Sequence, residues 1–79
     1  MKNKILQKFE VNERVIILTL ALEGDMSSED LAALLGETME TIEERIKSIK
    51  LKNPKILFEK QDKLSIENEI KKAIIGDKK

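Results

Sequence analysis

The 79-residue chain contains no cysteine and no histidine. The missing cysteine excludes a disulfide framework, a thiolate nucleophile and a cysteine-ligated zinc site. The missing histidine removes the commonest general base and metal ligand of proteins. The composition therefore predicts a protein that is not an enzyme and that uses neither a metal nor a cofactor.

Long hydrophobic segments are absent as well. The longest apolar run, residues 15–22, has eight residues and includes Thr19, whereas a membrane-spanning helix needs about 20. Residues 1–6 are basic and then apolar, but polar and charged residues follow before a signal-peptide core forms. We therefore expect a cytoplasmic protein that makes no contact with a membrane.

Charge is plentiful but balanced. Charged residues make up 38% of the chain, and the 15 basic side chains equal the 15 acidic ones in number. The two signs are nevertheless segregated, because residues 26–49 hold two basic and six acidic side chains while residues 50–79 hold nine lysines and five acids. The net charge argues against general affinity for nucleic acid, but the local lysine cluster keeps such affinity open.

The length predicts one small domain, residues 1–79. Residues 1–10 are predicted to form an N-terminal arm, an extension of the first helix or a short strand, and residues 76–79 a charged tail. The first helix is expected to begin near Asn12, a fair N-cap, and to end at Gly24. Residues 15–17 also fit a buried strand, since periodicity alone does not separate the two. One face of the expected helix carries Val11, Val15, Leu18 and Leu22, with Ile16 and Thr19 beside it.

Two further helices have clearer boundaries. Ser27 and Asp30 have the spacing of a capping box, which predicts a short helix over residues 28–35 that ends at Gly36. Thr38 is placed to cap the next helix, which the Asn53–Pro54 pair ends. The expected inward stripes are Leu31, Leu34 and Leu35 on the shorter helix, and Met39, Ile42, Ile46 and Ile49 on the longer one.

The apolar period changes after this point. Residues 55–66 read as two short strands around a polar turn at 61–63. A last helix is then predicted up to Gly76, with an apolar stripe made of Ile66, Ile70, Ala73 and Ile74.

The stretch from Leu31 to Ile49 resembles the helix-turn-helix of winged-helix proteins, because Ala32 precedes Gly36 by four residues and allows two helices to approach closely. The hairpin at 55–66 then resembles the wing, so the likeness covers about residues 12–66. It implies a mainly α fold with a small β-hairpin. This fold is a winged helix-turn-helix of three helices, a two-stranded wing and a C-terminal helix, with the helix-turn-helix at about 28–50. A three-helix bundle with an unstructured hairpin segment is the alternative.

In the family that the chain resembles, the second helix of the motif enters the DNA major groove and the wing contacts the DNA backbone. The resemblance thus implies a small DNA-binding protein of transcription regulation, acting as a dimer. The implied base contacts are Thr41, Arg45 and Ser48. The implied backbone contacts are Lys47, Lys50, Lys52, Lys55, Lys60 and Lys63.

A protein-binding role is the alternative function. Glu40, Glu43 and Glu44 lie on the exposed side of the motif's second helix and would repel phosphates. The chain would then be a winged-helix protein-interaction module that binds a protein partner through the acidic helix at 39–50. The C-terminal helix at 66–75 offers a second surface for a partner or for a homodimer. Family frequency favours DNA binding, and the charge distribution favours protein binding.

Overall fold

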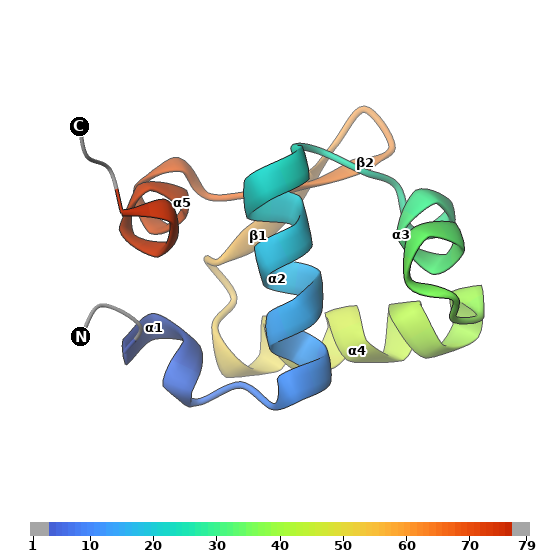
Figure 1. Cartoon of the computed structure of the whole chain (residues 1–79), viewed down its shortest axis with the longest axis horizontal. Helices are drawn as coiled ribbons and strands as arrows, with labels where there is room; N and C mark the ends of the chain where they lie inside the picture. Colours follow the sequence, from blue (N-terminus) through green and yellow to red (C-terminus); the bar gives the residue numbers. More distant parts are fainter. Residues whose placement is uncertain (1–3, 77–79) are drawn as a thin grey trace.

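The computed structural model describes residues 4–76, which form helices and one two-stranded antiparallel sheet (Figure 1). The elements are α1 (Lys4–Gln7), α2 (Val11–Glu23), α3 (Ser28–Leu35), α4 (Met39–Lys52), β1 (Leu57–Lys60), β2 (Lys63–Ile66) and α5 (Asn68–Ile75). Helices α2, α3 and α4 are followed by a hairpin and a C-terminal helix, which confirms the predicted mainly α layout. This order is compatible with winged-helix topology.

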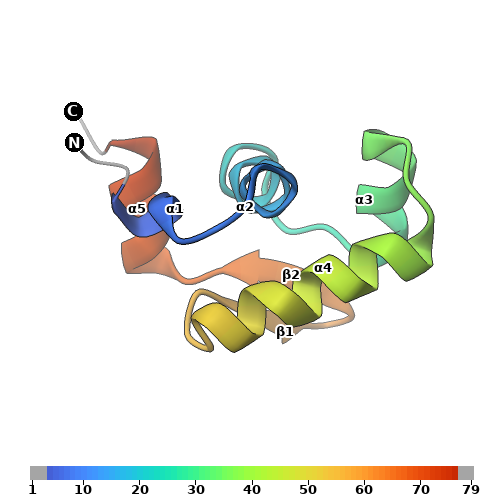
Figure 2. The same ribbon diagram turned by 90° about the horizontal axis from the view of Figure 1, so that it is seen from below.

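Helix α2 runs through the middle of the molecule, with α3 on one side of it and α1 and α5 on the other (Figures 1 and 2). Seen along α2 in Figure 2, α4 and the hairpin cross on one side of this helix, and no described element covers its opposite side. The core fills the space between α2, α4 and the hairpin. Its larger fully buried side chains are Phe9, Ile16, Ile17, Leu20, Leu31, Ile42, Ile49 and Ile56.

The face of α2 that packs on the core is not the face that carries Val11 and Leu22. These two side chains are 69% and 68% exposed, whereas Ile16 and Ile17 are fully buried. Eight consecutive residues of largely apolar character supply a hydrophobic stripe on every side of the helix, so periodicity did not identify the inner one.

The start of α2 also differs from the prediction. The N-cap is Glu10 rather than Asn12, and α2 begins at Val11. The Glu10 amide donates to Oε1 of the third helical residue, Glu13, at 2.9 Å. The two glutamates thus have the arrangement of a capping box.

Helices α3 and α4 begin and end as predicted. Ser27 Oγ accepts a hydrogen bond from the Asp30 amide at 3.0 Å, and Thr38 Oγ1 accepts one from the Thr41 amide at 3.1 Å. Gly36 ends α3 at a φ of +70°, a conformation that side chains with a Cβ rarely adopt. Asn53 is extended and ends α4 before Pro54.

The inward stripes of these two helices are only partly as expected. Leu31 is buried on α3, as are Ile42, Ile46 and Ile49 on α4. Leu34 and Met39 are instead 57% and 42% exposed, so both were wrongly placed in the core. Leu34 lies in the last turn of α3 and Met39 is the first residue of α4, so both flank the turn between the two helices.

The hairpin is one residue tighter at its turn than predicted. Strands β1 and β2 pair in register from Leu57 opposite Ile66 to Lys60 opposite Lys63, so Lys63 belongs to a strand. The turn consists of Gln61 and Asp62, whose φ angles are +54° and +67°. Two positive φ values in a two-residue loop are typical of the turn whose twist matches the strands of a hairpin.

The segment between α2 and α3 lies against the free edge of β2. The Met26 amide donates to the Leu64 carbonyl at 3.2 Å, and the Leu64 amide donates to the Met26 carbonyl at 2.7 Å. This isolated antiparallel bridge anchors the start of the helix-turn-helix to the hairpin.

Residues 4–10 form α1 and a turn, rather than an arm, an extension of α2 or a short strand. Leu6 and Phe9 are buried in the core. The Nε atom of Arg14 donates to the carbonyls of both residues, at 3.0 Å and 2.9 Å, and so holds the turn against α2. Residues 1–3 of the predicted arm lie outside the described residues.

Helix α5 contributes partly buried side chains to the edge of the core. Ile70 and Ile74 pack against the core cluster, Ala73 is exposed, and Ile66 belongs to β2 rather than to the helix. The predicted stripe on this helix is therefore reduced to Ile70 and Ile74. Gly76 ends α5 as expected, and residues 77–79 of the predicted tail lie outside the described residues.

Candidate nucleic-acid interface

The exposed surface of α4 changes character along its length. Glu40, Glu43 and Glu44 are exposed on its first two turns, and Lys47 and Leu51 follow on its second half. Leu51 is 81% exposed. The first half of this surface is therefore acidic, as expected from the sequence, and would repel a phosphate backbone.

Two of the predicted DNA contacts on α4 are instead bound to a buried carboxylate. Ser48 Oγ donates to Glu13 Oε2 at 2.5 Å, and Lys52 Nζ donates to Glu13 Oε1 at 2.7 Å. Lys52 Nζ also lies 5.9 Å from the centre of the Phe9 ring. These contacts join α2 to α4, so Ser48 and Lys52 have structural partners within the chain.

The Glu13 carboxylate is 5% exposed, and its environment acts on its pKa in two directions. Burial raises the pKa of Glu13, but the hydrogen bonds from Lys52, Ser48 and the Glu10 amide outweigh burial, so the pKa lies below its ordinary value. The group therefore stays ionised and paired with Lys52 at neutral pH.

Thr41 and Arg45 are also engaged within the chain. Thr41 is half-buried, and its Oγ1 accepts a hydrogen bond from Thr38 Oγ1 at 2.9 Å. Arg45 forms an ion pair with Glu37 of the α3–α4 turn, with 3.5 Å between Nη1 and Oε2. Together with Ser48, these residues were the predicted base contacts, and all three have an intramolecular partner.

A cleft of about 280 Å³ separates α4 from the hairpin. Its charged lining comprises Glu43, Lys47 and Lys50 of α4 and Glu59 of β1. Lys50 Nζ lies 3.7 Å from Glu59 Oε2, an ion pair that connects α4 to the hairpin. Lys47 contributes an exposed ammonium that forms no ion pair within the described part of the chain.

The hairpin carries two lysines directly opposite each other. Lys60 and Lys63 are the cross-strand pair that flanks the turn, so their Cβ atoms are about 5 Å apart. Both side chains are exposed, and neither forms an ion pair with another described residue. Like charges in this position destabilise a hairpin. An anion between them would remove the repulsion.

Lys55 is the remaining predicted backbone contact, and it is exposed in the turn between α4 and β1. Its amide donates to Asn53 Oδ1 at 3.1 Å, which fixes the backbone but leaves the ammonium in solvent. Of the nine predicted nucleic-acid contacts, the structure thus leaves four without an intramolecular side-chain partner among residues 4–76, namely Lys47, Lys55, Lys60 and Lys63.

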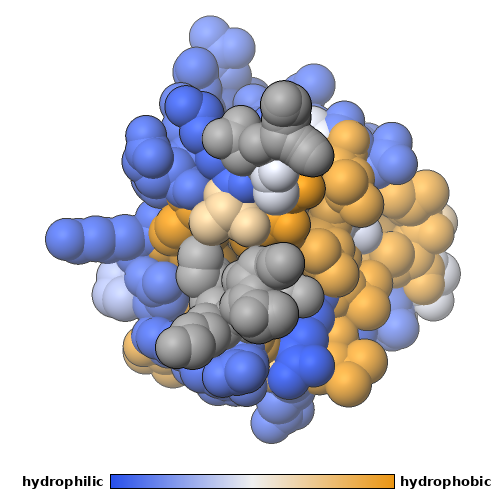
Figure 3. Space-filling model, turned by 60° about the vertical axis from the view of Figure 1, so that its left-hand side comes forward, coloured by the Kyte–Doolittle hydropathy of each residue, from blue (hydrophilic) through white to orange (hydrophobic). Residues whose placement is uncertain are grey.

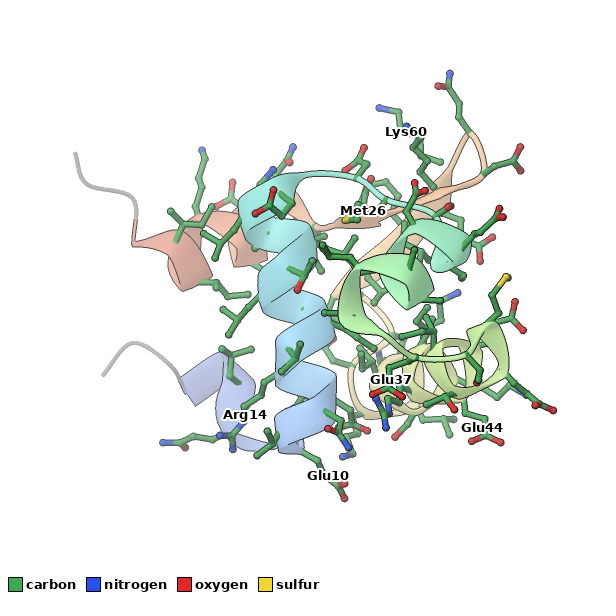
Figure 4. The ribbon with its side chains drawn as sticks, turned by 45° about the vertical axis from the view of Figure 1, so that its right-hand side comes forward. Glu10, Arg14, Met26, Glu37, Glu44 and Lys60 are labelled. Atoms are coloured by element: carbon green, nitrogen blue, oxygen red, sulfur yellow. The ribbon has the colours of Figure 1, made fainter. Side chains whose placement is uncertain are left out.

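The charges at the two ends of this region are spatially separate. Figure 4 shows Lys60 on the hairpin, whereas Glu37 and Glu44 lie at the α3–α4 turn and on α4 at the other side of α3. The hairpin tip carries Lys60 and Lys63 against one carboxylate, Asp62, so it is weakly basic, whereas the beginning of α4 is acidic. A single anionic partner would approach the hairpin and avoid the first turns of α4.

Glu13 is the residue that the sequence interpretation overlooked. It lies on the same helical face as Ile16, Ile17 and Leu20, at the spacing of one inward stripe. An acidic residue in such a stripe needs a buried partner, and this spacing was the available signal.

Residues 4–76 contain no group of three or more acidic side chains placed to hold a metal ion. Within the same range, no helix combines the length and the apolar character that crossing a bilayer requires. No family model, no curated protein and no solved structure matches this chain. The physical features of its surface therefore carry the functional argument.

Proposed function

We propose that the chain is a small cytoplasmic, non-enzymatic winged-helix protein that binds DNA through the phosphate backbone. The observation that carries the proposal is the cross-strand pair of Lys60 and Lys63 at the hairpin tip. Two exposed like charges in direct opposition destabilise a hairpin. A phosphate bound between the two ammonium groups would relieve their repulsion, and this relief would favour binding.

Backbone contact accounts for the other exposed lysines as well. Lys55 precedes β1, and Lys47 lies across the cleft from the hairpin. Thr41, Arg45 and Ser48 are engaged inside the protein, so few side chains of α4 are available to read bases. We therefore expect binding with little sequence preference, since phosphate contacts position a protein without specifying a sequence.

Fluorescence anisotropy with a labelled DNA duplex at low salt tests the proposal. The variant Lys60→Gln/Lys63→Gln should bind at least about tenfold more weakly than the wild-type chain, because two phosphate contacts and their counterion release are lost. The matched control is Lys71→Gln/Lys72→Gln, which removes the same charge from α5. Absence of wild-type binding, or an equal loss in both variants, would refute the proposal.

A second candidate function is docking of a basic protein on the acidic part of α4. Glu40, Glu43 and Glu44 are exposed there, and Met39 beside them is 42% exposed. Carboxylates around an exposed apolar side chain suit a basic, partly apolar surface of a partner. The other predicted surface, α5, offers Ile75 at 50% exposure, while Ile70 and Ile74 pack on the core.

Affinity capture with the wild-type chain and with Glu40→Gln/Glu43→Gln/Glu44→Gln tests this second function. A specific partner should be recovered by the wild-type chain and lost by the triple variant. The variant Glu23→Gln/Glu29→Gln/Glu69→Gln removes the same charge elsewhere and should retain the partner. Equal recovery by both variants would exclude α4 as the docking surface.

A further inference from the structure

Helix α2 carries an exposed apolar stripe on the side away from the core. Val11, Val15 and Leu22 are 69%, 40% and 68% exposed, and Leu18 between them is half-buried, with part of its side chain packed on the core. Figure 3 shows a broad hydrophobic area on the surface that includes this side of the molecule. Single exposed apolar residues are ordinary, but a contiguous patch on a small protein marks an interaction surface.

The spacing of these residues is that of a helix-pairing seam. Val11, Val15, Leu18 and Leu22 follow one another at intervals of four, three and four residues. Alternation of these intervals keeps apolar side chains on one line of a helix that packs along a second helix. We propose that this stripe, here called the α2 seam, pairs antiparallel with the α2 seam of a second copy of the chain.

The α2 seam is complementary to itself when the two helices run in opposite directions. A two-fold axis near Ile16 and Ile17, close to the middle of α2, places Val11 opposite Leu22 of the partner subunit. The same axis places Val15 opposite Leu18 of the partner subunit. Each contact then joins a smaller β-branched side chain to a larger leucine, which favours close packing along the whole helix.

The charges at the two ends of α2 also complement each other. Lys8 lies just before the helix and Asp25 just after it, and both are exposed without an ion pair among the described residues. Antiparallel pairing brings the beginning of one α2 to the end of the other. Lys8 thereby approaches Asp25 of the partner subunit, and the contact occurs twice.

The surface next to the α2 seam is not flat. A hollow of about 280 Å³ beside the seam, lined by Leu6, Gln7, Arg14 and Leu18, provides space for a side chain of the other helix.

The proposed dimer leaves the candidate nucleic-acid interface open. Helix α4 and the hairpin lie on the other side of α2 (Figure 2). The inference is therefore independent of what the hairpin binds.

Sedimentation equilibrium tests the pairing. The wild-type chain should have about twice its monomer mass of 9.1 kDa at micromolar to millimolar concentration. Leu22→Lys should raise the dimer dissociation constant at least about tenfold, because a charge replaces an apolar seam residue in both subunits. Leu51→Lys makes the same change at a side chain that is 81% exposed on α4, and it should leave the dimer intact. A monomeric wild-type chain, or an equal effect of both substitutions, would overturn the proposal.

Engineered cysteines test the direction of the helices, since the chain has no cysteine of its own. Antiparallel pairing predicts that an equimolar mixture of Val11→Cys and Leu22→Cys oxidises to a mixed disulfide dimer, whereas neither variant alone does so. Crosslinking of each variant with itself would show parallel pairing and refute the register. The substitution Lys8→Asp should weaken the dimer, and Asp25→Lys in the same chain should restore it. Failure of the double variant to recover would remove the end-to-end ion pair from the proposal.

Discussion

Lys52 Nζ donates a hydrogen bond to Glu13 Oε1 at 2.7 Å, although 39 residues separate the two in the sequence. The contact joins α2 to the last turn of α4, and Ser48 donates to the other oxygen of the same carboxylate. The orientation of α4 against the core thus depends on a buried acid as well as on isoleucines. Lys52 and Ser48 serve this contact, so the free lysines around the hairpin become the candidates for an external anion.

Glu13→Ala should destabilise the fold by about 2 kcal/mol or more. The substitution leaves Ser48 and the Glu10 amide without their acceptor and removes the partner of the Lys52 ammonium. Urea unfolding followed by circular dichroism, at one fixed protein concentration, measures the change. Glu44→Ala is the control, because Glu44 is exposed on α4 and should change stability by less than about 0.5 kcal/mol. Equal effects of the two substitutions would contradict the structural role of Glu13.

The same carboxylate should give the fold a defined acid sensitivity. The folded-state pKa of Glu13 lies below its ordinary value of 4.5, so the unfolded chain takes up this proton at a higher pH than the folded chain does. The stabilisation by Glu13 is therefore complete above pH 4.5 and is lost as the pH falls through the lower folded-state pKa. Wild-type and Glu13→Gln chains, unfolded in urea at a series of pH values, should differ in stability at neutral pH and converge in acid. A constant difference across the series would show that Glu13 does not titrate in this way.

The turn of the hairpin should accept a stabilising change. Gln61 and Asp62 both have positive φ angles, which are unfavourable for residues with a Cβ and are readily adopted by an Asn-Gly pair. Gln61→Asn/Asp62→Gly should therefore raise the free energy of unfolding by about 0.5–1 kcal/mol. Thermal unfolding of the double variant measures the gain, and a lower melting temperature than that of the wild-type chain would contradict the turn geometry.

Two apolar residues in the same turn of α4 should respond very differently to truncation. Ile49 is fully buried and Leu51 is 81% exposed. Ile49→Ala should cost about 2–5 kcal/mol through lost burial and a residual cavity, whereas Leu51→Ala should cost less than about 0.5 kcal/mol. Chemical denaturation of both variants distinguishes them. A similar loss in each would indicate that α4 is rotated relative to the core.

Local rules predicted most of the helix-turn-helix and hairpin. The capping hydroxyls of Ser27 and Thr38, the glycine that ends α3 and the proline that follows α4 each act on neighbouring residues, so the sequence alone reveals them. Ile42, Ile46 and Ile49 stand out because charged residues surround them. Lys60 and Lys63 of the hairpin each follow an acidic residue in the sequence, and both are exposed.

Features that depend on distant partners were not predictable in this way. Helix α2 is apolar on every side, so only its neighbours in space determine which side is buried. The bridge between Met26 and Leu64 joins backbones and leaves no side-chain pattern. The partners of Thr41, Arg45 and Ser48 depend on rotamers and on helix packing. Because all three side chains are engaged within the chain, the predicted base contacts are not part of the candidate interface.

The salt dependence of duplex binding tests most directly the claim that free lysines around the hairpin bind phosphate. Each phosphate contact contributes about −0.9 to the slope of log K against log salt concentration. Contacts by Lys47, Lys55, Lys60 and Lys63 predict a slope of about −3.6 for the wild-type chain, and loss of two contacts predicts about −1.8 for Lys60→Gln/Lys63→Gln. A wild-type slope near zero, or the same slope for both proteins, would contradict the account.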